Sequence, residues 1–286
     1  IPFDMVSFYN DCRIVEPYIK WMEFYVKEST ETSVWENGKC TPYGDHIHES
    51  SLNKLKQFWK ADGTVKNDTL FVQCMTIVRQ ARFIIKTMKE LGYEEEAKRT
   101  QGYLDVFIPR ITERYAKDGV WNPQLKTRQQ TAIGLYWSGQ TNHARTVKDL
   151  ANSCVEDFKI TNGHQIAGSR FTDPLLDLLS RGGHVDEAFR LLTREDYPSW
   201  LNMINETGGS IREQWGSYDS ANQIEGLTAV GNWWYRNMVG IMPSLGAHAF
   251  REFDLRPTVP NEVGTYEFKY DSPRGMIGSR WKASGN

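Results

Sequence analysis

Several features that mark common protein classes are missing from this sequence of 286 residues. No apolar run approaches the roughly 20 residues that a membrane-spanning helix needs. The net charge is −2, and lysines and arginines alternate with acids along the chain, so there is no basic stripe of the kind that binds nucleic acid. We therefore expect neither a membrane nor a nucleic acid as a partner.

Cysteine is scarce, and its spacing does not suit a metal site. Cys12, Cys40, Cys74 and Cys154 are far apart in the chain. Cys74 falls on the apolar face of an expected helix, where a thiol behaves as a small hydrophobic side chain. We expect all four thiols to be free and structural.

The usual cofactor and metal motifs are also absent. The sequence contains no nucleotide-binding loop, no zinc motif and no Gly-x-Ser-x-Gly elbow. His46 and His48 are the only close pair of histidines, and a spacing of two does not place both on one helix face. A polar loop is the preferred interpretation of that pair, so we expect neither a metal nor a cofactor.

Aromatic residues, by contrast, are abundant: ten tryptophans, thirteen tyrosines and thirteen phenylalanines. Indole rings can stack on the apolar C–H faces of sugars, so a tryptophan-rich cleft suits a carbohydrate ligand. A large helical core that is rich in aromatic residues is the other interpretation. Composition alone leaves both open.

Most of the chain has the apolar period of α-helices, with hydrophobic residues three and four positions apart. Asp68 is placed to cap one helix, and Gly92 follows its end. Pro109 suggests a kink or an early break in the next helix. The expected helices cover 11–28, 70–91, 94–115, 129–138, 146–158, 172–180, 185–192 and 221–240.

Successive helices joined by short turns predict an array of antiparallel helical hairpins. Such an array can be an open solenoid or a closed toroid. Because no residue signature of a tetratricopeptide or ankyrin type repeats along the chain, a toroid is favoured. The polar stretch from Ser29 to about Gly63 is long for a loop, and loops of that length are usually functional or contain short elements of their own.

After Gly246 the pattern changes to an alternation with period two, over 249–256, 264–270 and 275–281. We expect a helical domain over 1–246 and the beginning of a β-domain over 247–286. The chain opens at Ile1 without an initiator methionine, and both ends look cut from a longer polypeptide, whose remainder would be a partner. The compartment stays open: glycosylation sequons at Asn67 and Asn205 do not establish secretion, and an extracellular or periplasmic location is only slightly favoured.

Glu213 is the candidate catalytic carboxylate. Hydrolysis of a glycosidic bond needs two carboxyl groups, one protonated to assist the leaving oxygen and one ionised. Glu213 lies between Arg212 and Trp215 in a segment whose glycines permit close backbone approach to a ligand. A neighbouring ring can tune the acidity of a carboxyl group. The alternative is a surface glutamate paired with Arg212.

Further segments occur in one order along the chain and carry a family resemblance. They are Tyr43-Gly-Asp45, Gly163-His-Gln-Ile-Ala-Gly168, Ala188-Phe-Arg-Leu-Leu192, Tyr197-Pro-Ser-Trp200, Ser210-Ile-Arg-Glu-Gln-Trp215, Ser220-Ala-Asn-Gln223, Gly231-Asn-Trp-Trp-Tyr-Arg236, Gly240-Ile241 and 270–281. Their order and spacing resemble the catalytic domain of the bacterial and fungal α-L-rhamnosidase family of glycoside hydrolases, with 270–281 similar to the entry of its C-terminal β-sandwich. The resemblance covers essentially the whole chain.

This resemblance implies a mainly α fold, an incomplete (α/α)6 toroid of helical hairpins followed by the first strands of a β-sandwich. It implies cleavage of terminal L-rhamnose from a rhamnosylated glycan or glycoside, with inversion. Glu213 matches the position of the family's general base. Trp200 and Trp215 are then expected as aromatic walls of the sugar site, and Asp45 as a ligand of a sugar hydroxyl.

Three departures from the family pattern bear on activity and substrate. The family's general acid lies in an Asp-rich motif containing Asp-Glu-Arg-Leu-Gly-Trp, which would precede Ile1 and does not occur in this sequence. Gln223 stands where the family commonly has a sugar-binding histidine, and an amide cannot carry charge. His46 stands where a tryptophan usually follows the aspartate.

Three functions therefore compete. The first is an inverting α-L-rhamnosidase or a close relative, of which this chain is a part that lacks the general acid. The second is a lyase acting on rhamnose–uronate linkages, an alternative motivated by Gln223 and His46. The third is a helical module that binds glycans without catalysis.

Overall fold

The computed structural model describes residues 2–31, 69–117, 120–121, 128–140, 146–168, 170–212, 215, 230–244 and 247–282. Within these ranges the chain is mainly helical, and its last two strands follow all of its helices. The helices are α1 Pro2–Tyr9, α2 Ile19–Glu31, α4 Thr69–Glu90, α5 Glu94–Tyr115, α6 Arg128–Ser138, α7 Val147–Ile160, α8 Thr172–Arg181, α9 Val185–Thr193, α10 Trp200–Thr207 and α12 Val230–Trp233. The strands are β1 Ala116–Lys117, β2 Val120–Trp121, β3 Ile241–Pro243, β4 Phe253–Leu255, β5 Thr265–Ser272 and β6 Gly275–Lys282.

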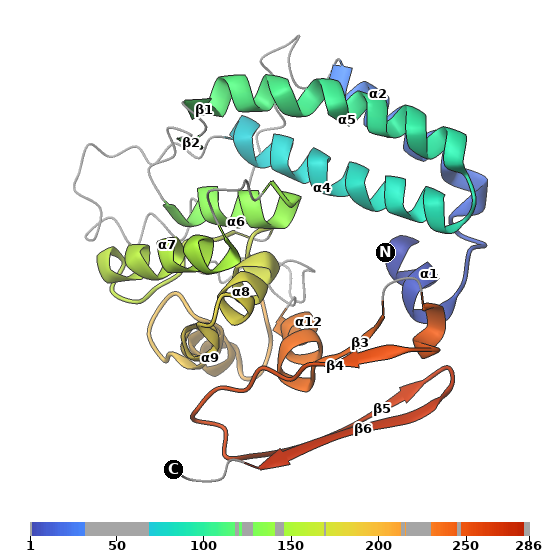
Figure 1. The fold of residues 1–286 in the computed structure, drawn as a ribbon. Helices are drawn as coiled ribbons and strands as arrows, with labels where there is room; N and C mark the ends of the chain where they lie inside the picture. The colour runs from blue at the N-terminus through green and yellow to red at the C-terminus, as the bar shows by residue number, and fades with distance from the viewer. Residues whose placement is uncertain are drawn as a thin grey trace.

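The helices pack as successive hairpins that follow an arc (Figure 1). Helix α4 contacts α6, α6 contacts α8, and α8 contacts α12. Each of α5, α7 and α9 packs against the helix before it in the chain. This layered arrangement of helical hairpins confirms the mainly α fold of the toroid type expected from the sequence.

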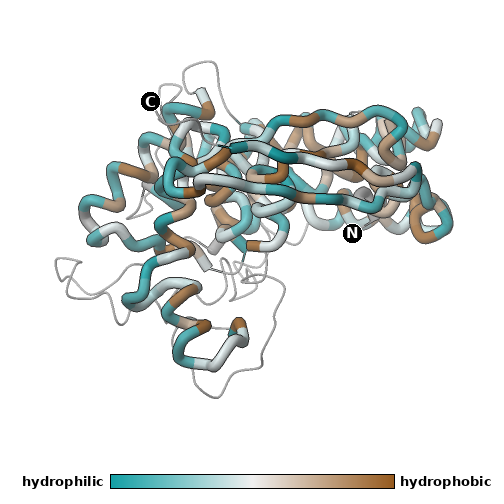
Figure 2. The backbone as a smooth tube through the Cα atoms, turned by 90° about the horizontal axis from the view of Figure 1, so that it is seen from below, coloured by the Kyte–Doolittle hydropathy of each residue, from teal (hydrophilic) through white to brown (hydrophobic). Residues whose placement is uncertain are grey.

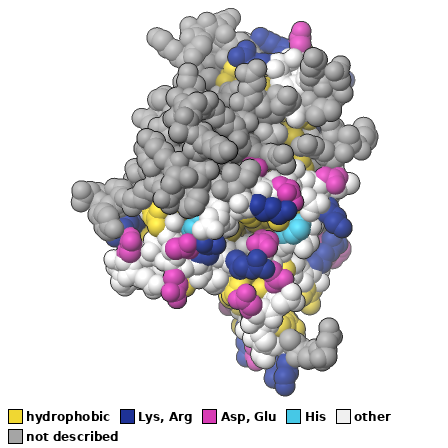
Figure 3. All heavy atoms as spheres, turned by 90° about the vertical axis from the view of Figure 1, so that its left-hand side faces the viewer, with side chains coloured by type: hydrophobic (Ala, Val, Ile, Leu, Met, Phe, Trp, Pro, Cys, Tyr) yellow, Lys and Arg dark blue, Asp and Glu magenta, His cyan; other side chains and the backbone are white. Residues whose placement is uncertain are grey.

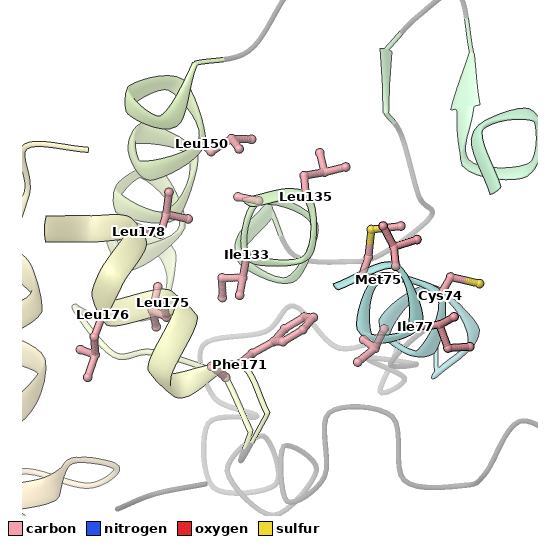
Figure 4. Packing of buried hydrophobic residues seen from close by; sticks show 14 of the residues in the cluster. Cys74, Met75, Ile77, Ile133, Leu135, Leu150, Phe171, Leu175, Leu176 and Leu178 are labelled. Atoms are coloured by element: carbon pink, nitrogen blue, oxygen red, sulfur yellow. The ribbon is translucent and has the colours of Figure 1, made fainter. Parts of the chain in front are cut away.

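Two layers of helices differ in how far they are buried. In α8 all residues from Thr172 to Ser180 are buried except Asp173 and Asp177, whereas in α9 only Ala188, Leu191 and Leu192 are buried. The hydrophobic core runs between the two layers (Figure 4). There Phe171 points from the start of α8 toward α4 and α6, and its ring meets the Trp137 ring edge-on at 5.8 Å.

Helix α4 confirms the face and the end that the sequence predicts. The apolar spacing from Leu70 to Leu91 predicts one broad buried face for this helix. The residues of that face are buried or partly buried, and Cys74 among them is fully buried. At its end the Tyr93 N–H donates to Met88 O at 2.8 Å, and the Gly92 N–H donates to Lys89 O at 3.1 Å. These two bonds form a Schellman motif, and Gly92 adopts the left-handed φ of 82° that the motif requires.

The first expected helix is shorter than predicted. A 3-10 turn covers Glu16–Tyr18 and α2 begins at Ile19, because Pro17 suits the first turn of a helix but not its interior. The apolar spacing predicts one buried face of Ile14, Val15, Tyr18, Ile19, Met22 and Tyr25. This prediction is wrong in part: Val15 and Ile19 are buried, whereas Ile14, Tyr18 and Tyr25 are exposed. The buried side of this segment continues instead through Val26.

Helix α5 runs through Pro109 to Tyr115, so the early break that this proline suggests does not occur. A proline removes one hydrogen bond of the helix ladder, whereas Leu104, Phe107 and Ile111 are all buried on either side of it. Packing against neighbouring helices therefore sustains this helix. Helices α1 and α10 are not among those that the sequence predicts.

The last residues form two strand pairs. Strands β5 and β6 pair antiparallel from Thr265↔Lys282 to Ser272↔Gly275, which leaves Pro273-Arg274 as the turn. Figure 2 shows this hairpin lying along one side of the helices. The expected strand over 249–256 is wrong in part, because His248–Phe250 is a 3-10 turn and only Phe253–Leu255 is extended, paired with β3.

Gly240 joins the helices to the strands. The helix that begins at Val230 continues as π-helical turns over Trp234–Val239 and ends at Gly240, where the sequence predicts its end. Gly240 has a φ of 69°, and a Cβ at this position would lie 2.3 Å from the carbonyl carbon of Arg256. The backbone can therefore turn into β3 beside Arg256 only because this residue has no side chain.

Charges of both signs are mixed over the described part of the face in Figure 3. In the described ranges, no helix is both long and apolar enough to cross a bilayer. Cys12, Cys74 and Cys154 are free thiols, as expected, and Cys40 lies outside the described residues.

Candidate functional site

Two of the six predicted site residues lie in the described part of the chain. Trp200 and Trp215 are described by the structure, whereas Asp45, His46, Glu213 and Gln223 lie outside the described residues. The geometry of the site is therefore built from the residues around Trp200 and Trp215. Their contacts show what holds the segment that contains Glu213.

Trp200 is the first residue of α10. Ser199 caps this helix, since its Oγ accepts a hydrogen bond from the Asn202 N–H at 3.1 Å. The indole of Trp200 meets that of Trp215 edge-on, with 4.7 Å between the ring centroids and 89° between the planes. Each residue is only 2% exposed. The two rings therefore form a packed pair, a geometry favoured by the quadrupoles of aromatic rings.

Trp215 also reaches the connection between α7 and α8. Its Nε1–H donates to Ala167 O at 3.3 Å. The Trp215 indole, from the segment that carries Glu213, thus contacts both the start of α10 and the connection that contains Ala167. Both rings are buried by this packing, and their role as aromatic walls of a sugar site stays a prediction.

His164 is a second buried tie, and the sequence reasoning did not single it out. Its side chain is 3% exposed. Its Nδ1 lies 3.3 Å from Pro198 O, and its Nε2 lies 3.1 Å from Asp196 Oδ2. Burial and the neighbouring charge of Arg194 lower the pKa of His164. An imidazole that contacts two connections is a positioning element. Only its place in the family-like segment Gly163–Gly168 could have signalled this.

Buried polar groups continue from this point to α6. The Gln129 N–H donates to Asp157 Oδ2 at 3.0 Å, and Gln129 Oε1 accepts from the Ile166 N–H at 3.3 Å. Gln129, Asp157 and Gln165 are all buried. Polar side chains buried in a helical core usually order the backbone that they contact. Here they order residues 161–168, the stretch against which Trp215 packs.

Arg212 immediately precedes Glu213 and is 7% exposed. Its backbone N–H contacts Met203 Sδ at 3.0 Å, and its Nη1 lies 3.5 Å from Glu206 Oε2. The segment before Glu213 is thus held against α10 by both backbone and side chain. In the part of the chain that the structure describes, no three His, Cys, Asp or Glu side chains gather in a way that could hold a metal ion.

Comparison with known proteins decides the family. Residues 1–238 match the model of the bacterial alpha-L-rhamnosidase 6 hairpin glycosidase domain. The chain belongs to this family. Residues 240–286 match the bacterial alpha-L-rhamnosidase C-terminal domain, so two family models together span nearly the whole sequence. The division at residue 246 that the sequence suggests stays a prediction.

Individual relatives of this chain are also named alpha-L-rhamnosidases. An alpha-L-rhamnosidase of Streptomyces avermitilis is 30% identical over 304 residues, which cover 99% of this chain and 26% of that protein. A crystal structure of a Streptomyces avermitilis alpha-L-rhamnosidase complexed with L-rhamnose matches with a TM-score of 0.77 at 20% identity, over 99% of this chain and 26% of that one. Native α-L-rhamnosidase from Aspergillus terreus matches with a TM-score of 0.82 at 16% identity, over 99% of this chain and 33% of that one.

The chain spans about a quarter of the length of its Streptomyces relative and a third of the Aspergillus structure. The structural matches are below 25% identity and establish the fold of helical hairpins. They agree with the architecture seen in Figure 1.

Proposed function

We propose that the protein is an α-L-rhamnosidase that hydrolyses terminal rhamnosyl linkages of a glycan or glycoside with inversion. The observation that carries this proposal is the family match over residues 1–238, which includes every residue of the predicted site. The packing of Trp215 against Trp200 and Ala167 supports it, because a catalytic carboxylate needs a rigid segment to hold it.

Glu213 acts as the general base in this mechanism. It takes a proton from a water molecule, which attacks the anomeric carbon from the face opposite the leaving oxygen. Asp45, His46 and Gln223 bind hydroxyl groups of the sugar, and Trp200 and Trp215 form the apolar side of the site. As a neutral amide, Gln223 can donate and accept hydrogen bonds at every pH at which the protein is folded.

The leaving oxygen requires a second carboxyl group. In an inverting enzyme this acid stands about 6.5–9.5 Å from the base, which leaves room for the water. The sequence contains no Asp-Glu-Arg-Leu-Gly-Trp segment. We place the general acid in a part of the protein outside this sequence. The residues of this sequence then supply the general base and the sugar contacts named above.

The base is tested by the Glu213→Gln variant of the full-length protein on an aryl α-L-rhamnoside. We expect kcat to fall by about 10²–10⁴-fold, the usual contribution of a general base, with little change in KM. Glu187→Gln removes a partly exposed carboxylate on α9, which pairs with Arg190, and serves as the matched control. An unchanged rate in Glu213→Gln would rule out the role given to Glu213.

Stereochemistry is tested independently by following the reaction with proton NMR. Inversion predicts that β-L-rhamnose appears first and then mutarotates. Retention would instead require a covalent intermediate and a nucleophile, and it would contradict the mechanism while leaving the substrate assignment intact.

A lyase acting on rhamnose–uronate linkages is the second candidate, favoured by Gln223 and His46 at positions where the family commonly has other residues. Elimination leaves an unsaturated uronyl group that absorbs near the ultraviolet edge. An ultraviolet-absorbing product from a uronate-containing glycan, without release of rhamnose from the aryl rhamnoside, would replace the hydrolase proposal with this one.

A further inference from the structure

A concave pocket of about 340 Å³ lies between α4, the end of α6, the start of α8 and the π-helical turns that follow α12. We call it the basic pocket, defined by four cationic residues and two aromatic ones: Arg79, Arg82, Lys86, Arg236, Phe83 and Trp137. None of these residues belongs to the predicted rhamnose site. The pocket draws its lining from α4, α6, α8 and the π-helical turns, so its shape rests on packed elements of the core.

The lining carries an excess of positive charge. Among the described lining residues the carboxylates are Asp173 and Asp177, against four cations, of which Lys86 pairs with Glu90 at 3.7 Å. The chain as a whole has a net charge of −2, so this local balance is opposite in sign to that of the protein. A concave surface lined by one sign of charge raises the local concentration of ligands of the opposite sign.

Both aspartates already have partners. Asp177 Oδ2 accepts a hydrogen bond from the Tyr136 hydroxyl, and Asp177 Oδ1 accepts from Asn237 and pairs with Arg181 at 2.9 Å. Asp173 faces Arg236, with 3.9 Å between Oδ2 and Nη1. The carboxylates therefore pair directly with Arg181 and Arg236, and they act on Arg79 only at longer range.

The two arginines of α4 contact a helix end instead of an acid. Arg79 Nη1 donates to Trp137 O at 3.0 Å, and Arg82 Nη1 donates to Ser138 O at 2.6 Å. These carbonyls lie at the C-terminal end of α6, whose dipole supplies only about half a negative charge. Neither arginine forms an ion pair with a carboxylate in the described ranges. Burial is the main cause that lowers the pKa of Arg79 to about 10; the charge of Arg236 adds to this effect, and those of Asp173 and Asp177 oppose it.

Aromatic rings hold one of these cations in place. The Arg79 guanidinium lies 4.5 Å from the centroid of the Phe83 ring and 5.0 Å from that of the Trp137 ring. Stacking and the bond to Trp137 O orient the planar group before any ligand arrives. The same rings give the pocket an apolar side, as in sites that accept a sugar ring. The volume falls within the range of about 300–1,000 Å³ that is usual for small-molecule sites.

We propose that the basic pocket binds a sugar acid, with its carboxylate at Arg79 and Arg82 and its ring against the apolar side. A guanidinium presents parallel N–H donors that match a carboxylate, so two preorganised arginines suit this group better than a neutral hydroxyl. This binding is independent of the proposed hydrolysis of rhamnosides.

The test is isothermal titration of the chain with D-galacturonate, D-galactose and acetate. We expect galacturonate to bind about tenfold or more tightly than galactose, because the two differ only in the carboxylate, and than acetate, which lacks the ring. Added salt should weaken the binding of galacturonate. Equal affinity for galactose would overturn the role of the cations, and equal affinity for acetate would overturn the role of the ring.

Variants locate the site. Arg82→Gln should weaken galacturonate binding by about tenfold, since the amide carries no charge to pair with the carboxylate. Arg82→Lys should retain more of the affinity, and Arg190→Gln, which removes an exposed arginine of α9, should bind as the parent does. Circular dichroism checks that each variant is folded. Parental affinity in a folded Arg82→Gln would overturn the proposal, whatever the outcome for rhamnoside hydrolysis.

Discussion

The helical hairpins and the C-terminal strands differ in how completely each element is covered. Helix α8 contacts α6, α7, α9 and α12, and most of its side chains are buried. Strand β5 pairs only with β6 within the described ranges, and the buried residues around this hairpin form a small cluster of Val239, Ile241, Phe250 and Tyr266. Two strands alone are marginal in water, so the difference teaches that stability resides in the helices.

The largest expected effect on the free energy of unfolding comes from comparing the same Met→Ala substitution in the two regions. Met88, at the end of α4, is fully buried, whereas Met276, at the tip of the β5–β6 hairpin, is 62% exposed. Met88→Ala should lower the free energy of unfolding by about 2–5 kcal/mol through lost contacts and a cavity. Met276→Ala should change it by less than about 0.5 kcal/mol. Urea denaturation followed by tryptophan fluorescence measures both, and similar losses would show that the two regions are equally well packed.

The second-largest expected effect on stability lies at the junction between the helices and the strands. Gly240→Ala forces a left-handed φ on a residue with a side chain and places its Cβ against the backbone of Arg256. We expect a loss of about 2–4 kcal/mol from strain and overpacking together. Gly264→Ala is the control, because no atom lies within 4 Å of a Cβ there. If thermal unfolding shows equal stability for both variants, the helices and strands do not depend on this close approach.

The smallest expected effect on the free energy of unfolding comes from removing one tyrosine hydroxyl in each region. The Tyr136 hydroxyl, in α6, donates to Asp177, whereas the buried Tyr266 hydroxyl, in β5, has no hydrogen-bond partner among the residues that the structure describes. Tyr136→Phe should cost about 1.5–3 kcal/mol, the usual worth of a hydrogen bond to a charged group. Tyr266→Phe should be neutral or stabilise by up to about 1 kcal/mol, since it removes an unsatisfied buried group. Equal losses in urea denaturation would mean that the Tyr266 hydroxyl has a partner in solution.

The same contrast explains which elements could be predicted. The ranges expected for α4 to α9 agree with the structure to within one or two residues at most ends, because each helix has a long apolar face and clear ends, such as Gly92. The segment around Pro17 was harder, since apolar residues there lie on both sides of the helix and only one side is covered. Ala249 and Phe250 begin a segment, 249–256, whose apolar residues alternate as in a strand, yet both have left-handed φ values.

For the candidate site, sequence motifs and structure supply different parts. The motifs place Glu213 and its neighbours in one family pattern, and four of the six predicted residues lie outside the described ranges. The contact between Trp215 and Ala167 joins residues 48 positions apart, and the contacts of His164 span 32 and 34 positions. No local pattern encodes such pairs, because they depend on how the connections fold over the helix ends.

The sequence by itself determined the succession of helical hairpins, the change to strands near the C-terminus and the family, because periodicity, caps and ordered motifs are local properties of the chain. Only the tertiary structure decided that Trp200 and Trp215 pack against each other, that α5 continues through Pro109, and that three cations of α4 line one pocket with Arg236. Those outcomes depend on which helices become neighbours, and burial between neighbours outweighs the preferences of single residues.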